Sequence, residues 1–294
     1  MGIMELLKIS NKDIKKIKKY ELSNDINNTE SNIYIYNNNE LLKIFKNSHD
    51  IINKFYVLNK LFYIKENLEF KELVLPNKLL KIDSEPSGYS MDYIKQNTNI
   101  GLILKKNNIS FNDKKFLLIE LAKIIKKIEN NKLLKKINFH LGDIHEYNFI
   151  YDNKENMIKA IDLDSAYVEG AYAPISKFLT YNEKLWSLEN KYPCQVDKLR
   201  RIAIQIPNNN TTIISYIYIL LNILTGEYSP DFSIKKFCDI LNMLDESGIK
   251  KELLDAIYNI YLPNDNYIDY DLINSISEKQ YNNFKLLQLK KVKK

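Results

Sequence analysis

Cysteine and histidine are scarce in this sequence, and their scarcity excludes several classes of protein. The two cysteines, Cys194 and Cys238, lie far apart and fit no metal-binding or redox spacing. A small disulfide scaffold is therefore excluded, and a reducing, cytoplasmic setting is the simpler expectation. With 294 residues the chain can bury a large core, which suits one large domain or two lobes packed together.

Long apolar runs are also missing. The longest, IISYIYILLNILTG from Ile213, is shorter than the roughly 20 residues that span a bilayer, and it contains Ser215 and Asn222. It predicts a buried core helix. The segment from Met1 to Leu22 carries charges throughout and lacks the apolar core and cleavage site of a secretory signal. We therefore expect neither export nor a membrane partner.

Most of the chain has no run of charges of one sign. The net charge of +6 comes from 43 basic and 37 acidic residues, and the lysines are scattered rather than striped. The densest basic cluster, LKKVKK from Leu289, is typical of a solvated chain end. The sequence therefore predicts no specific nucleic-acid partner.

Two of only three histidines fall in one short stretch, HLGDIHEYNFIY. It contains His140, Asp143, His145 and Asn148, and after the loop DNKEN a short strand follows that ends in Asp162 and Asp164. A turn-linked pair of strands would bring Asp143, Asn148 and Asp162 within reach of one point. Carboxylate and amide oxygens are ligands that Mg²⁺ prefers. The nearby Asp164 is expected to be structural, capping the segment that follows.

Upstream of this stretch, the sequence predicts a hairpin over residues 31 to 46 with its turn at Asn37 to Asn39. In the second strand, Leu41, Lys43 and Phe45 share one face. Lys43 thus either snorkels to water or is held to meet an anion. Further predicted elements are a helix over residues 50 to 65, strands at LVLP and from Gly88 to Ile94, and helices from Ser110, over residues 211 to 224 before Gly226, and near 234 to 244 and 249 to 261. This order predicts a small, mostly β lobe followed by a mostly helical one.

The polar stretch resembles the catalytic loop of the protein-kinase-like superfamily. There an Asp is followed five residues later by an Asn, and an Asp at the end of a later strand binds metal. Asp143, Asn148 and Asp162 match that order. His145, with Gly142 before the Asp, is more similar to the GDxHxxN form of aminoglycoside and choline phosphotransferases than to the HRDxKxxN form of protein kinases.

The resemblance extends over most of the chain. ELLKIFK resembles the strand that carries the phosphate-pairing lysine, here Lys43, and ISYIYILLNILTGE resembles the central helix of the large lobe in protein kinases. MDYI resembles the hinge whose backbone meets adenine, which comprises Met91, Asp92, Tyr93 and Ile94. The implied fold is α+β, a two-lobed protein-kinase-like fold with an N-lobe over residues 1–94 and a C-lobe over residues 95–294.

The resemblance implies transfer of the γ-phosphoryl group of ATP, with Mg²⁺, to a hydroxyl. Asp143 would accept or orient the hydroxyl proton, Asn148 and Asp162 would hold Mg²⁺, and Lys43 would neutralise charge on the α and β oxygens. His145 would either hydrogen-bond a carboxylate or contact the transferred phosphate.

The sequence also departs from the family pattern. The segment NNTESN between Ile26 and Ile33, where a glycine-rich loop is expected, contains no glycine. Residues 57 to 63, VLNKLFY, contain no glutamate to pair with Lys43, and Leu141 stands where protein kinases have His or Arg. The chain is therefore identified as a divergent member.

Three alternatives stay open beside a kinase that acts on protein Ser or Thr. The catalytic loop favours a small-molecule kinase of the aminoglycoside or choline type, whereas the departures favour a pseudokinase that acts as a binding module. A hydrolase would use His140, Asp143, His145 and Asp162 as ligands of Zn²⁺ or another transition metal. The segment from Ser165 to Pro193, which would shape the acceptor site, resembles neither kinase branch closely.

Overall fold

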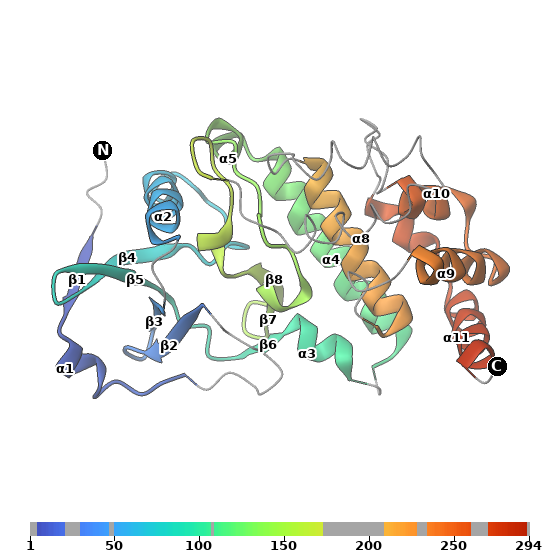
Figure 1. Cartoon of the computed structure of the whole chain (residues 1–294), viewed down its shortest axis with the longest axis horizontal. Helices are drawn as coiled ribbons and strands as arrows, with labels where there is room; N and C mark the ends of the chain where they lie inside the picture. The colour runs from blue at the N-terminus through green and yellow to red at the C-terminus, as the bar shows by residue number, and fades with distance from the viewer. Residues whose placement is uncertain are drawn as a thin grey trace. The chain divides into compact units, whose positions relative to one another are not determined.

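The computed structural model describes residues 5–20, 30–46, 50–106, 109–172, 209–227, 234–259 and 270–292 (Figure 1). The chain is α+β, with a five-stranded sheet, a three-stranded sheet and helices. It divides into two compact units: the first comprises Met1–Leu102, Glu129–Leu141 and Tyr147–Tyr172, and the second comprises Ile103–Ile128, Gly142–Glu146 and Ala173–Lys294. The lobes predicted over residues 1–94 and 95–294 stay a prediction.

The five-stranded sheet belongs to the first unit and has the order β1-β4-β5-β3-β2. Its strands are β1 (Leu6–Ile9), β2 (Ser31–Ile35), β3 (Glu40–Phe45), β4 (Pro76–Ile82) and β5 (Glu85–Asp92). The predicted hairpin is confirmed as β2 and β3. Its turn closes through Asn37 Oδ1, which accepts hydrogen bonds from the backbone N–H groups of Asn39 and Glu40 at 2.8 and 2.9 Å.

The two faces of β3 pack against different partners, as the alternation along the strand predicts. Leu42 joins Leu80 and Ile14, the last residue of α1 (Asn11–Ile14), in one apolar cluster. On the other face, Phe45 packs against the cluster that includes Leu58 of α2 (Ile51–Lys65). Because alternate residues share a face, Lys43 lies on the α2 side of the sheet.

The strand predicted at LVLP is wrong. Leu73 makes only an isolated bridge to Ala160, and the N–H of Val74 donates to the Ala160 carbonyl at 2.9 Å, so this segment runs beside the smaller sheet. β4 begins at Pro76, where the missing N–H of proline is tolerated as the first residue of a strand. The next predicted strand is confirmed with shifted ends, since β5 starts at Glu85 and stops at Asp92.

Gly88 on β5 permits the close approach of β3 at Lys43. A Cβ atom added to Gly88 would lie 1.9 Å from the Lys43 carbonyl oxygen, which is backbone and cannot move aside cheaply. We expect Gly88→Ala to lower the free energy of unfolding by about 1–3 kcal/mol through overpacking. Urea denaturation measures this, with Ser87→Ala on the same strand as the control that should change it by less than about 0.5 kcal/mol. An equal effect of the two substitutions would contradict the steric explanation.

The three-stranded sheet also lies in the first unit and has the order β6-β7-β8, all antiparallel. Its strands are β6 (Asn97–Asn99), β7 (Phe149–Asp152) and β8 (Met157–Ala160). The turn-linked strands predicted after the polar stretch are thereby confirmed as β7 and β8, but the second strand ends at Ala160, before Asp162 and Asp164. The short helices nearby in sequence are α3 (Ile100–Lys105), which follows β6 directly, and α5 (Lys132–Lys136).

The described part of the second unit is mostly helical, apart from the loop that begins at Gly142. Its helices are α4 (Phe111–Asn130, up to Ile128 in this unit), α8 (Asn209–Thr225), α9 (Ile234–Glu246), α10 (Lys251–Asn259) and α11 (Glu278–Val292). The predicted cap of α4 is confirmed, because Ser110 Oγ accepts from the Asp113 N–H at 3.1 Å. Tyr216 joins α8 to α4 by donating its hydroxyl to the Leu118 carbonyl at 3.1 Å. Gly226, with φ of +76°, ends α8 as predicted.

The prediction about membranes concerned the apolar run that forms α8. In the part of the chain that the structure describes, no helix is both long enough and apolar enough to cross a membrane.

Candidate functional site

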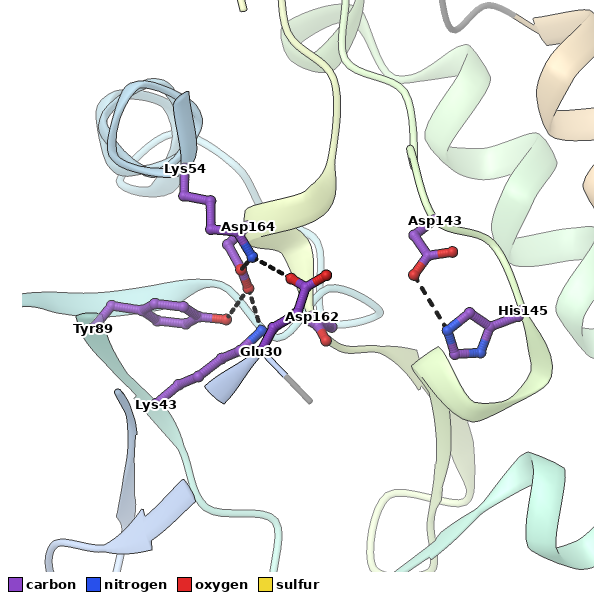
Figure 2. Close-up of polar contacts among 8 residues, drawn as sticks. All are labelled: Glu30, Lys43, Lys54, Tyr89, Asp143, His145, Asp162 and Asp164. Carbon is purple, nitrogen blue, oxygen red and sulfur yellow. Dashed lines mark hydrogen bonds and ion pairs between the residues drawn. The ribbon is translucent and has the colours of Figure 1, made fainter. Parts of the chain in front are cut away.

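Lys43 is held by carboxylates instead of reaching solvent. Its side chain is 4% exposed, and its ammonium contacts Asp162 Oδ1 and lies 2.5 Å from Asp164 Oδ1 (Figure 2). The rings of Phe45 and Tyr89 also flank it, each centroid 5.9 Å from Nζ. The snorkelling alternative is therefore excluded, and the anions that Lys43 meets belong to the protein itself.

Asp162 stands at the point where the chain leaves β8. Its backbone is left-handed, with φ of 63° and ψ of 43°, and it leads directly into the 3-10 turn Leu163–Ser165. Aspartate tolerates this conformation better than most residues. The Ile161 N–H donates to the Asn148 carbonyl at 2.9 Å, so Asn148 and Asp162 lie at the same end of the β7–β8 hairpin. The backbones of these two residues therefore lie close together, whereas the convergence of Asp143, Asn148 and Asp162 on one point stays a prediction.

Asp164 is the centre of a buried polar network that the sequence did not reveal. Its side chain is fully buried and accepts from Lys43, from the Tyr89 hydroxyl at 2.9 Å and from Lys54 Nζ at 3.1 Å (Figure 2). Lys54 also contacts Glu30 Oε2 at 2.7 Å. The expectation that Asp164 caps the following segment is wrong, because its oxygens face β3, β5 and α2 instead.

One sequence signal could have found Lys54. It lies three and four residues before Val57 and Leu58, which are fully buried on α2, so it falls on the stripe of the helix that faces the protein interior. A lysine in that stripe needs a buried anion, because a buried charge without a partner is costly.

Burial and charge act oppositely on this network. Burial lowers the pKa of Lys43, but the Asp162 and Asp164 carboxylates outweigh it and raise the pKa, so Lys43 stays charged. Burial would raise the pKa of Asp164, yet Lys43 and Lys54 hold that pKa well below its usual range. Burial raises the pKa of Asp162 to about 7, helped by the Asp164 charge and opposed by Lys43. Burial likewise raises the pKa of Tyr89, which keeps its hydroxyl protonated as a donor.

Asn148 and Asp162 have the donor chemistry for a hard divalent cation. The Asp162 side chain is 33% exposed, whereas that of Asp164 is fully buried. Mg²⁺ takes oxygen ligands and is commonly held by one or two carboxylates together with waters and phosphate oxygens. A carboxylate and an amide at one hairpin end therefore fit the protein's share of such a site.

The alternative of a hydrolase with Zn²⁺ requires three or more metal-binding side chains close together. Across the described ranges, no group of three or more His, Cys, Asp or Glu side chains is arranged to hold a metal ion. The set of His140, Asp143, His145 and Asp162 thus gains no support. His140 instead exchanges two backbone hydrogen bonds with Tyr167, at 2.9 and 2.8 Å, and burial lowers its pKa.

The predicted hinge spans the end of β5. Met91 and Asp92 are the last two residues of that strand, and Met91 packs against the apolar cluster that includes Leu58 of α2. The Tyr93 N–H donates to the Asn39 carbonyl at 2.8 Å, and the Ile94 carbonyl accepts from the Asn97 side chain. The role of these four residues in binding adenine stays a prediction.

Asp143 and His145 belong to the second unit and contact each other there. Nε2 of His145 lies 3.3 Å from Oδ2 of Asp143 (Figure 2), which supports the first of the two roles predicted for this histidine. The following residue, Glu146, accepts from Nδ2 of Asn222 on α8 at 3.3 Å. α8 therefore holds the end of this loop.

Two predicted features lie partly outside the described residues. The segment in which a glycine-rich loop is expected is described only from Glu30 onward, and the acceptor-side segment only up to Tyr172.

No protein-family model matches this chain, and no curated protein matches it in sequence.

Proposed function

We propose that this chain is an ATP-dependent phosphotransferase of the protein-kinase-like superfamily, with the two-lobed fold of that family. The observation that carries the proposal is the contact between the buried ammonium of Lys43 on β3 and the carboxylate of Asp162 just after β8, where the backbone of Asn148 is hydrogen-bonded to the preceding Ile161. A phosphate-binding cation beside oxygen ligands for Mg²⁺ is the arrangement that phosphoryl transfer from ATP requires.

The charges of the first unit support this assignment. Among the residues that the structure describes, the carboxylates of Glu30, Asp162 and Asp164 contact the ammonium groups of Lys43 and Lys54. Once Asp162 is ionised, this set carries more negative than positive charge, which favours a divalent cation. The Asp162 side chain is the accessible one, because it is 33% exposed whereas that of Asp164 is fully buried. Asn148 and Asp162 would hold Mg²⁺, which when bound neutralises charge on the phosphates.

The chain's own residues then divide the remaining work. Lys43, whose raised pKa keeps it charged, would donate to the α and β phosphate oxygens. Asp143 would accept or orient the proton of the acceptor hydroxyl, and His145, by its contact with that carboxylate, would orient it. The backbone of Met91 to Ile94 would meet adenine. Positioning and electrostatics supply most of the catalysis in such a site.

The acceptor that we propose is a protein Ser or Thr hydroxyl. The contact between His145 and Asp143, in a loop of the GDxHxxN form, favours a second candidate, a small hydroxyl-bearing molecule. A pseudokinase would bind the nucleotide or a partner and transfer nothing.

Transfer of labelled γ-phosphate from Mg-ATP tests the proposal. Wild type is compared with Asp143→Ala on the protein itself and on proteins of a cell extract, and we expect a loss of about 10²–10⁴-fold in the variant. Asp245→Ala, at an exposed aspartate on α9 of the same unit, is the control that should transfer normally. If no protein becomes labelled, the proposal of a protein acceptor is rejected. If wild type and Asp143→Ala label proteins equally, the proposed role of Asp143 is rejected.

A further inference from the structure

The buried network around Asp164 divides the two carboxylate oxygens between different partners. Oδ1 accepts from Lys43 at 2.5 Å and from the Tyr89 hydroxyl at 2.9 Å, whereas Oδ2 accepts from Lys54 at 3.1 Å. Three donors on β3, β5 and α2 thus fix the plane of one fully buried carboxylate. Such a carboxylate can orient a flexible side chain, because its own orientation is determined on both sides.

Lys43 needs an orienting partner of this kind. A lysine ammonium is a point charge on a flexible stem, so holding it in one place costs side-chain entropy. Among the described residues, its carboxylate partners are Asp162 and Asp164, and Asp162 is also the residue proposed to bind Mg²⁺. When Asp162 serves the metal, Asp164 is the carboxylate that keeps Lys43 in place.

Lys54 completes the arrangement from the helix that lacks the expected glutamate. Its ammonium lies 5.1 Å from the Phe45 ring centroid and bridges Asp164 to Glu30, so it holds Asp164 from the side opposite Lys43. We propose that Lys54 and Asp164 are a positioning pair that aims Lys43 at the phosphates of the nucleotide. This inference rests on the proposed function. In this chain Asp164, which follows β8, and Lys54, on α2, would together do the work of the glutamate that is expected on the helix and is missing.

Nucleotide binding separates a positioning role from a purely structural one, because only ATP carries phosphates. We would measure the Kd of Mg-ATP and of adenosine by calorimetry for wild type, Lys54→Met and Lys54→Arg. Lys159→Met is a matched control, since Lys159 is also 9% exposed and pairs with one buried aspartate, Asp152, and one more exposed glutamate, Glu155.

We expect Lys54→Met to weaken Mg-ATP at least about tenfold while adenosine changes by less than about twofold. Lys54→Arg should recover most of the loss, and Lys159→Met should leave both constants unchanged. Asp164→Asn, measured at a temperature where it is folded, should show the same loss confined to ATP.

Other results overturn the inference. Unchanged ATP binding in Lys54→Met rejects the positioning role, and equal losses of ATP and adenosine show that Lys54 only stabilises the fold. Failure of wild type to bind Mg-ATP overturns the proposed function together with this inference, whereas binding by wild type and Lys54→Met alike overturns this inference alone.

Discussion

Asp162→Asn is expected to reduce Mg²⁺-dependent phosphoryl transfer by about 10³-fold or more, because it removes the ionised ligand on which the metal site depends. Asparagine is the appropriate replacement, since it tolerates the left-handed backbone of residue 162 (φ 63°) as aspartate does. The loss therefore reports the missing charge, not a disturbed turn. Transfer of labelled γ-phosphate measures the rate. A titration with Mg²⁺ then shows whether the residual rate of the variant still depends on the metal as that of wild type does.

Ligand-dependent stability provides a second measurement on the same variant. A ligand that binds only the folded state raises the midpoint of thermal unfolding. Mg-ATP should therefore stabilise wild type and fail to stabilise Asp162→Asn. Asp83→Asn is the matched control, because Asp83 has a similar left-handed backbone (φ 49°) in the turn between β4 and β5, and its midpoint should rise with Mg-ATP as in wild type. Full turnover or full stabilisation of Asp162→Asn would reject the site.

The pH dependence of stability follows from the same carboxylate. The pKa of Asp162 in the folded chain is about 7, above the value of about 3.9 for an unfolded aspartate. Its contribution to stability is thus full below about pH 3.9 and is lost as the pH rises through 7. Without ligand at pH 8, Asp162→Asn should unfold at the same temperature as wild type or higher. A lower midpoint would show that the Lys43 contact outweighs burial.

Local patterns in the sequence predicted the elements whose structure neighbouring residues determine. The alternation around Lys43, the Ser110 cap and Gly226 after α8 each depend on contacts within a few residues, and each is confirmed. The closeness of Asn148 and Asp162 along the backbone was also predictable, because the short β7–β8 hairpin joins the segments that carry them.

Contacts between residues that are far apart in the sequence cannot be predicted from neighbouring residues in this way. β1 pairs with β4 in parallel, with Leu6 opposite Leu79, and neither strand was predicted. Lys54 and Asp164 are 110 residues apart in the chain, and nothing beside Lys54 specifies which acid it meets. The sequence therefore predicted Asp162 and Lys43 as site residues but missed Lys54, Tyr89 and the way in which the Asp164 carboxylate joins them to Lys43.

Asp164→Asn is expected to lower the free energy of unfolding by about 3–5 kcal/mol, the usual result of removing one partner from a buried ion pair. The neutral amide would leave the ammonium groups of Lys43 and Lys54 in the interior without the charge that neutralises them both. Urea denaturation is the appropriate measurement, because guanidinium is itself a salt and screens charge. A change below about 1 kcal/mol would mean that water or Asp162 replaces the lost charge.

A comparison with another buried aspartate isolates the effect of the second lysine. Asp152 pairs with one buried lysine, Lys159, and that lysine would still have Glu155 as a partner in Asp152→Asn. Asp152→Asn should therefore lower the free energy of unfolding by less than Asp164→Asn.

The pH dependence of stability tests the role of the Asp164 charge. The pKa of Asp164 is held well below its ordinary value of about 3.9, so the contribution of Asp164 to stability is full above that value and is lost as the pH falls below it. The difference between wild type and Asp164→Asn should therefore shrink from pH 7 to pH 3. A difference independent of pH would assign the loss to packing, whereas a shrinking one assigns it to the charge that holds the two lysines.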